Sequence, residues 1–106
     1  MLKKKVSLMD IAKEVKGYLS EYIHVRKLIL FGSYKQGSQR DDSDIDLAVI
    51  SDDFEKMSVI EKMNLLAKVS VYVDSRLEVM GFSYRDFLNP EKSSLLRLIK
   101  RTGKVV

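Results

Sequence analysis

Apolar residues recur at helical spacing near the start of the chain and then form two concentrated runs. Apolar positions from 8 to 22 lie three or four residues apart, which predicts an amphipathic helix. Ser7 precedes this segment with Asp10 three residues on, a pattern typical of a helix N-cap. The segment 25–31 ends in four consecutive apolar residues and predicts a buried strand, and residues 44–51 predict a second strand.

The second half of the chain predicts a helix followed by a third strand. Apolar residues return to helical spacing from 57 to about 69. The β-branched segment 69–73 alternates, so a strand competes there, and we assign it to the end of the helix. Residues 76–82 alternate as a strand would, with Glu78 and Leu77 on opposite faces.

A last helix is predicted near the C-terminal end. Asn89 and Pro90 suit the N-cap and first turn of a helix, and Gly103 suits its end. Val105 and Val106 are expected to pack as a short tail. Strands alternating with helices predict a small α/β (α+β) fold with a mixed sheet, helices packed on one face, and a single domain over residues 1–106.

Composition excludes several classes of site. The chain has 106 residues, no cysteine and one histidine, so disulfides, thiolate metal sites and multi-histidine zinc sites are excluded. No apolar run approaches the roughly 20 residues that span a bilayer, so no membrane association is expected and a cytoplasmic location is predicted. The net charge of +4 comes from lysines and arginines dispersed among acidic residues. This favours a solubilising surface over direct nucleic-acid binding.

The stretch between the first two strands contains the candidate chemistry. Gly32-Ser33 ends the first strand, and Asp44 and Asp46 begin the second. Residues i and i+2 of a strand point to the same face, so the two carboxylates would project together. Paired carboxylates repel, and a bound Mg²⁺ relieves that cost. The glycine turn would let backbone N–H groups approach a phosphate, which predicts metal-assisted phosphoryl or nucleotidyl transfer.

This stretch resembles the signature of the polymerase-β-type nucleotidyltransferase superfamily. The elements shared are Gly32-Ser33, a ten-residue gap and Asp44-Ile45-Asp46. The short chain is similar to a minimal nucleotidyltransferase, the antitoxin half (MNT) of toxin–antitoxin pairs whose other half is a helical ribonuclease of the HEPN type. The resemblance implies Mg²⁺-dependent transfer of AMP from ATP, or another nucleotide, to a tyrosine of that partner.

The resemblance also implies a third carboxylate, and we assign it to Glu78. Asp74 is the rival, although it lies at the turn before the strand, and Glu78 alternatively is a charged residue on a solvated face. Catalytic and metal-binding roles are assigned to Asp44, Asp46 and Glu78. Nucleotide-binding roles are assigned to Gly32, Ser33, Lys35, Gln36 and Arg40. Arg40 could equally pair with the neighbouring aspartates.

One position departs from the family pattern. Many relatives have a basic residue directly before the second glycine of the turn, where this chain has Gln36, with Lys35 one position earlier. This departure leaves a second hypothesis open, in which a nucleotide-binding antitoxin with little or no catalysis blocks its partner by forming a complex. A third hypothesis, transfer to a small molecule or RNA, is disfavoured because no second domain is predicted. The sequence leaves open whether the protein forms a homo- or hetero-oligomer.

Overall fold

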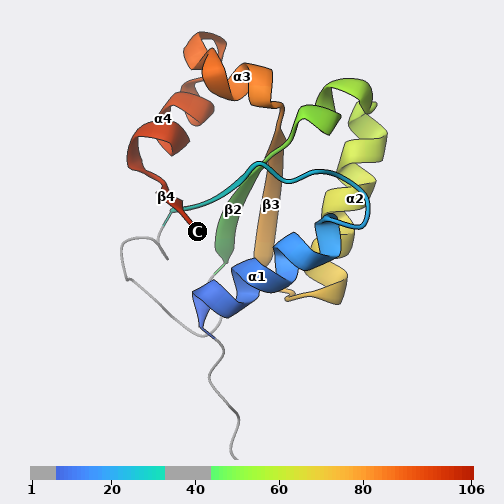
Figure 1. Cartoon of the computed structure of the whole chain (residues 1–106). Coiled ribbons are helices and arrows are strands. Elements are labelled where there is room, and N and C mark those ends of the chain that lie inside the picture. The colour runs from blue at the N-terminus through green and yellow to red at the C-terminus, as the bar shows by residue number, and fades with distance from the viewer. Residues whose placement is uncertain (1–6, 33–43) are drawn as a thin grey trace, which may run out of the picture.

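The computed structural model describes residues 7–32 and 44–106 (Figure 1). The elements are, in order, α1 (Leu8–Leu19), β1 (Lys27–Phe31), β2 (Ile45–Ile50), the 3₁₀ helix η1 (Asp52–Lys56), α2 (Val59–Tyr72), β3 (Leu77–Phe82), α3 (Tyr84–Leu88), the 3₁₀ helix η2 (Pro90–Lys92), α4 (Ser94–Thr102) and β4 (Lys104–Val105). The described part of the chain contains no helix that is both long and apolar enough to cross a membrane.

Within the described residues, four strands form one mixed sheet in the order β3-β2-β1-β4. β2 and β3 run parallel, whereas β1 is antiparallel to both β2 and β4. The register aligns Phe31 of β1 with Asp46 of β2 and Glu78 of β3. The mixed sheet confirms the predicted fold class, and the predicted C-terminal tail is the short edge strand β4.

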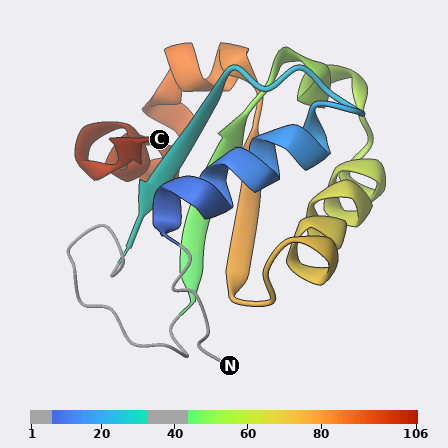
Figure 2. The ribbon, with the colours of Figure 1, turned by 60° about the horizontal axis from the view of Figure 1, so that its bottom comes forward.

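Alternating residues of the strands divide the core between the two faces of the sheet. Leu28, Leu47 and Leu77 belong to the core that α1 and α2 cover. Figure 2 shows α1 lying across this face. Ile29 and Ala48, on the opposite face, pack against residues of α3 and α4. The prediction of helices on one face therefore describes α1 and α2, while α3 and α4 form a second layer over part of the other face.

The first helix begins after Ser7, as predicted, and the second begins at Val59, two residues after the predicted residue 57. The Ser7 hydroxyl accepts a hydrogen bond from the Asp10 N–H at 3.1 Å. Ser58 and Glu61 form a reciprocal capping box at the start of α2. The β-branched segment 69–73 is helical as far as Tyr72, so the competing strand hypothesis is wrong. α1 ends at Leu19, earlier than the predicted residue 22.

The predicted start of the last helix at Asn89 is wrong. Asn89 makes no side-chain capping hydrogen bond, and Pro90 begins the short η2 instead. The α4 helix begins after Ser93, whose hydroxyl accepts from the Leu96 N–H at 3.1 Å. The helix ends at Gly103, as predicted. A Cβ at Gly103 would lie 2.4 Å from Ile29 Cγ2, so glycine allows the chain to turn closely against β1.

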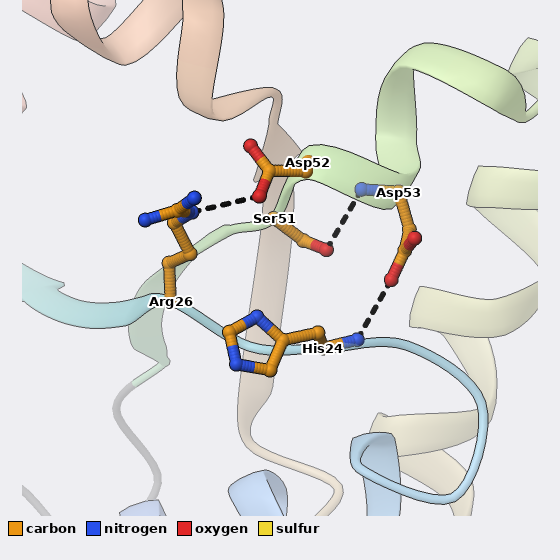
Figure 3. Close-up of polar contacts among 5 residues, drawn as sticks. All are labelled: His24, Arg26, Ser51, Asp52 and Asp53. Carbon is orange, nitrogen blue, oxygen red and sulfur yellow. Dashed lines mark hydrogen bonds and ion pairs between the residues drawn. The ribbon is translucent and has the colours of Figure 1, made fainter.

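Polar contacts at the C-terminal end of β2 join it to the segment before β1 (Figure 3). The Asp53 carboxylate accepts from the His24 backbone N–H at 2.7 Å, and Asp52 pairs with Arg26 at 2.8 Å. Arg26 also stacks over Tyr84, 4.0 Å from the ring centroid. His24 is an exposed loop residue at the opposite end of β2 from Asp46.

Candidate active site

The carboxylates lie on the part of the sheet that α4 leaves open. α3 and α4 pack over Ile29, Ala48 and Ile50, which occupy the middle and far end of this face. Asp46 belongs to the same face because it alternates with the buried residues of the α1–α2 core. Its register partner Glu78 is exposed on the adjacent parallel strand. Neighbouring strands lie about 4.8 Å apart, so the two carboxylates stand side by side.

The three carboxylates interact electrostatically. Asp44 is an exposed residue directly before β2, two positions from Asp46. The pKa of the Glu78 carboxyl is raised, first by a side-chain hydrogen bond with Asp46 and then by the negative charges of Asp44 and Asp46. This proximity is consistent with the prediction that Asp44, Asp46 and Glu78 lie close together.

The glycine that ends β1 lies directly against the Asp46 carboxylate. Gly32 has a positive φ of 79°, and a Cβ built on it would lie 2.4 Å from Asp46 Oδ2. A side chain at position 32 would therefore be both strained and in collision with the carboxylate. The structure thus places the start of the Gly-Ser turn next to the acidic residues. Ser33, Lys35, Gln36 and Arg40 lie outside the described residues.

The donor atoms fit a hard divalent cation. Within residues 7–32 and 44–106, no three His, Cys, Asp or Glu side chains already converge as a metal cage. Asp44, Asp46 and Glu78 nevertheless offer only carboxylate oxygens, which Mg²⁺ prefers. Their mutual repulsion, evident in the raised pKa of Glu78, is the cost that a cation would remove. The residues present therefore fit Mg²⁺.

The rival third carboxylate, Asp74, has a structural role. Its oxygens accept from the Arg76 backbone N–H at 2.9 Å and from the Arg76 guanidinium at 3.0 and 2.9 Å. This pairing lowers the pKa of Asp74. The Arg76 carbonyl accepts from the Ile45 N–H at 2.8 Å, which sets the register between β3 and β2. Asp74 therefore helps to align Glu78 with Asp46.

Sequence reasoning missed a groove beside Glu78. A groove of about 580 Å³ lies between α2 and the outer edge of β3 and includes Glu78 in its lining. Met63 of α2 and Met80 of β3 line it and are both exposed. The sequence does contain an indication, because α2 has apolar residues at more positions than one buried face requires.

The family model described as polymerase beta, nucleotidyltransferase matches residues 13–106. The chain belongs to this family. No curated protein matches the chain significantly. The match confirms the superfamily that the sequence signature indicated.

Solved structures of three other proteins share the fold. A chain of a toxin–antitoxin complex with AMP-PNP is 27% identical, with a TM-score of 0.63 over 88% of this chain and 69% of that one. A putative nucleotidyltransferase from Sulfolobus solfataricus is 17% identical, with a TM-score of 0.64 over 92% and 78%. A chain of the complex between tri-AMPylated Shewanella oneidensis HEPN toxin and MNT antitoxin is 23% identical, with a TM-score of 0.58 over 90% and 67%. The last two show likeness of fold alone.

Proposed function

We propose that this nucleotidyltransferase transfers AMP from ATP to a hydroxyl group of a protein partner, in a reaction that depends on Mg²⁺. The observation that supports this most strongly is the convergence of Gly32, Asp46 and Glu78 at the open end of the sheet. Bound Mg²⁺ would supply neutralisation of the negative charge that develops on the phosphates during transfer.

Asp44 and Asp46 are proposed to hold the metal. Asp44 directly precedes β2, and Asp46 is the second residue of β2, with its carboxylate beside Gly32. The N–H groups of the Gly32 turn, with Ser33, Lys35, Gln36 and Arg40, are proposed to bind the phosphates of the nucleotide. The relative crystallised with AMP-PNP supports ATP as the nucleotide.

Glu78 is proposed to accept the proton of the acceptor hydroxyl group. In the transfer, the acceptor oxygen bonds to the α-phosphorus, the bond from that phosphorus to pyrophosphate breaks, and the hydroxyl proton must leave. A carboxylate with a raised pKa accepts a proton more readily near neutral pH, which suits Glu78 to this task. Completion of a second metal site is the other role open to Glu78, and a Glu78→Gln variant loses both.

The proposed partner is a helical ribonuclease of the HEPN type, and modification of a tyrosine would silence it. Support comes from the relatives found in toxin–antitoxin complexes, one of which contains an AMPylated HEPN toxin. The product of the neighbouring gene is the first acceptor to test.

The test uses ATP labelled at either the α- or the γ-phosphate. The purified chain is incubated with Mg²⁺ and the candidate partner, and label on the partner is measured. We expect label from α-labelled ATP alone, and none with Asp46→Asn. Asp10→Asn, which changes an exposed aspartate of α1, serves as the control and should label normally.

Neutralisation without catalysis is the second candidate function, favoured by Gln36 at a position that is basic in many relatives. Co-expression of the partner with Asp46→Asn separates the two. Growth rescued by Asp46→Asn as fully as by the wild type would overturn AMP transfer as the means of neutralisation.

A further inference from the structure

We infer that the groove between α2 and the outer edge of β3 binds an extended apolar segment of the acceptor protein and presents its hydroxyl to Glu78. This inference rests on the proposed function, since it names where the acceptor of that reaction docks. The groove has a volume of about 580 Å³ and lies on the side of β3 away from β2.

The backbone of β3 offers one open hydrogen-bonding position in this groove. β3 is an edge strand, and its even-numbered residues face β2, as the bonds from the Ile45 and Ser51 N–H groups to the Arg76 and Phe82 carbonyls show. Successive residues of a strand point their backbone groups to opposite sides, so the groups of Leu77, Val79 and Gly81 point outward.

Two of those outward carbonyls are occupied by side chains of α2. The Leu77 carbonyl accepts from the Ser70 hydroxyl at 3.0 Å, and the Gly81 carbonyl accepts from the Lys62 ammonium at 3.1 Å. Val79, midway between them, keeps an outward N–H and C=O that no described side chain occupies. The edge is therefore protected against long strand pairing but accepts a short segment that pairs at Val79.

The side chains around Val79 suit an apolar segment. Met63, 62% exposed on α2, and Met80 of β3 line the groove, and methionine adapts to irregular apolar partners. Leu66 and Leu77 form part of its buried wall. Among the described residues of the lining, only Glu78 is acidic and only Lys62 is basic, so a strongly charged segment would gain little there.

The position of Glu78 identifies the occupant as an acceptor. Glu78 is the register partner of Asp46 and also belongs to the lining of the groove. It directly precedes Val79, so a segment paired at Val79 as a neighbouring strand would lie about 4.8 Å from β3 and place one of its residues beside Glu78. A segment docked there would bring a tyrosine hydroxyl to the chemistry, whereas a second copy of this chain would only block it.

The test measures binding without nucleotide, so that it can fail separately from catalysis. The probe is a peptide of alternating valine and threonine, about seven residues long, with tyrosine at its central position, added to the uniformly ¹⁵N-labelled full chain. We expect the largest amide shift changes at Val79 and Met63. The same peptide N-methylated at alternate backbone nitrogens should bind at least about tenfold more weakly, because the methyl groups remove the pairing N–H.

Matched variants of α2 locate the binding surface. Met63→Glu should weaken peptide binding by about tenfold or more, because a charge is placed in the apolar groove. Val71→Glu makes the same change at a residue that is 75% exposed on α2 and does not line the groove, and it should bind as the wild type does. Spectra of both variants without peptide verify that they are folded.

Three results would overturn the inference: no shift at Val79, equal binding by Met63→Glu and Val71→Glu, or β3 shifts that grow with protein concentration alone, which would indicate a second copy at this edge. Peptide binding with no transfer of AMP to the HEPN-type partner would instead overturn the proposed function and leave the groove assignment standing.

Discussion

At the scale of one residue, Gly32 matters because it ends β1 directly beside the Asp46 carboxylate. Its φ is positive, and a Cβ at this position would lie 2.4 Å from Asp46 Oδ2, so a side chain would be strained and the Asp46 carboxylate would have to move. Gly32→Ala should destabilise the protein by about 1–2 kcal/mol from the backbone alone. It should also displace the Asp46 carboxylate and reduce AMP transfer. Urea unfolding and the labelling assay measure the two effects.

Gly17 provides the control for that substitution. It lies inside α1, and a Cβ there would meet no atom of the described residues within 4 Å. Gly17→Ala should therefore stabilise the protein by about 0.5–1 kcal/mol and leave transfer unchanged. Equal effects of the two substitutions would contradict the role assigned to Gly32.

In the absence of metal, ionised Glu78 is expected to lower the free energy of unfolding of the protein. Asp46 and Asp44 raise the pKa of its carboxyl, so the ionised form is disfavoured in the folded state. Glu78→Gln removes this repulsion and should raise the melting temperature in metal-free buffer, while AMP transfer falls by about 10²–10⁴-fold. Glu14→Gln, at an exposed position of α1, is the control and should change neither.

The difference in stability between Glu78→Gln and the wild type should depend on pH, with a sign that follows from the raised pKa of Glu78. A carboxyl whose pKa is higher in the folded than in the unfolded state binds protons preferentially when folded, so its repulsion disappears as pH falls through the raised pKa. The stability difference between Glu78→Gln and the wild type should therefore be present near neutral pH and vanish in acid. A difference that grows toward low pH would contradict this explanation.

At the scale of elements, the start of α4 distinguishes the observed fold from the sequence expectation. Ser93→Ala removes the hydroxyl that accepts from the Leu96 N–H and should cost about 1 kcal/mol. Asn89→Ala should cost less, because Asn89 makes no cap bond to η2 and its side chain donates to the exposed Arg85 carbonyl. Thermal unfolding of both variants measures this, and a larger loss for Asn89→Ala would contradict the assigned start.

The elements that the sequence predicted well are those with a long or strong hydrophobic pattern. α1, α2 and the strands β1 to β3 all follow from spacing, and α2 keeps its helical period through β-branched residues. α3 was missed because five residues are too few to show a period, although Ser83 and Asp86 repeat the N-cap pattern of Ser7 and Asp10. Asn89 and Pro90 favour the start of a helix, and here they begin the single 3₁₀ turn η2 rather than α4.

The site was predictable where its geometry is local. Strand alternation, which the sequence contains, puts Asp46 on the face opposite Ile45 and Leu47, and Asp44 directly precedes the strand. The alignment of Asp46 with Glu78 depends on a register set between distant segments, and local spacing does not contain it. The groove beside Glu78 was missed for the same reason, since it exists only once α2 lies along β3.

At the scale of the molecule, the two helical layers cover the two faces of the sheet to different extents. α1 and α2 pack over one face of the sheet and form the larger core cluster with it, whereas α3 and α4 cover only part of the other face. The open part holds three carboxylates, and the hydrogen bond with Asp46 and the negative charges of Asp44 and Asp46 raise the pKa of Glu78 there.

Metal binding should therefore stabilise the whole protein. A cation that binds the folded state alone contributes about 2.7 kcal/mol at one hundred times its dissociation constant. For a domain of about 100 residues, each kcal/mol raises the melting temperature by about 4–8 °C. We expect Mg²⁺ to raise the melting temperature of the wild type but not of a variant with both Asp44→Asn and Asp46→Asn. A rise that is equal in both would place the metal elsewhere.

Intact-mass spectrometry of the HEPN-type partner tests the central claim most directly. The partner is incubated with ATP, Mg²⁺ and either the wild-type chain or Asp46→Asn, after both are shown to bind the partner equally. We expect the wild type to add one or more adenylyl groups, located on tyrosine, and Asp46→Asn to add none. A partner whose mass is unchanged by the wild-type chain, although the two proteins are bound, would contradict the claim.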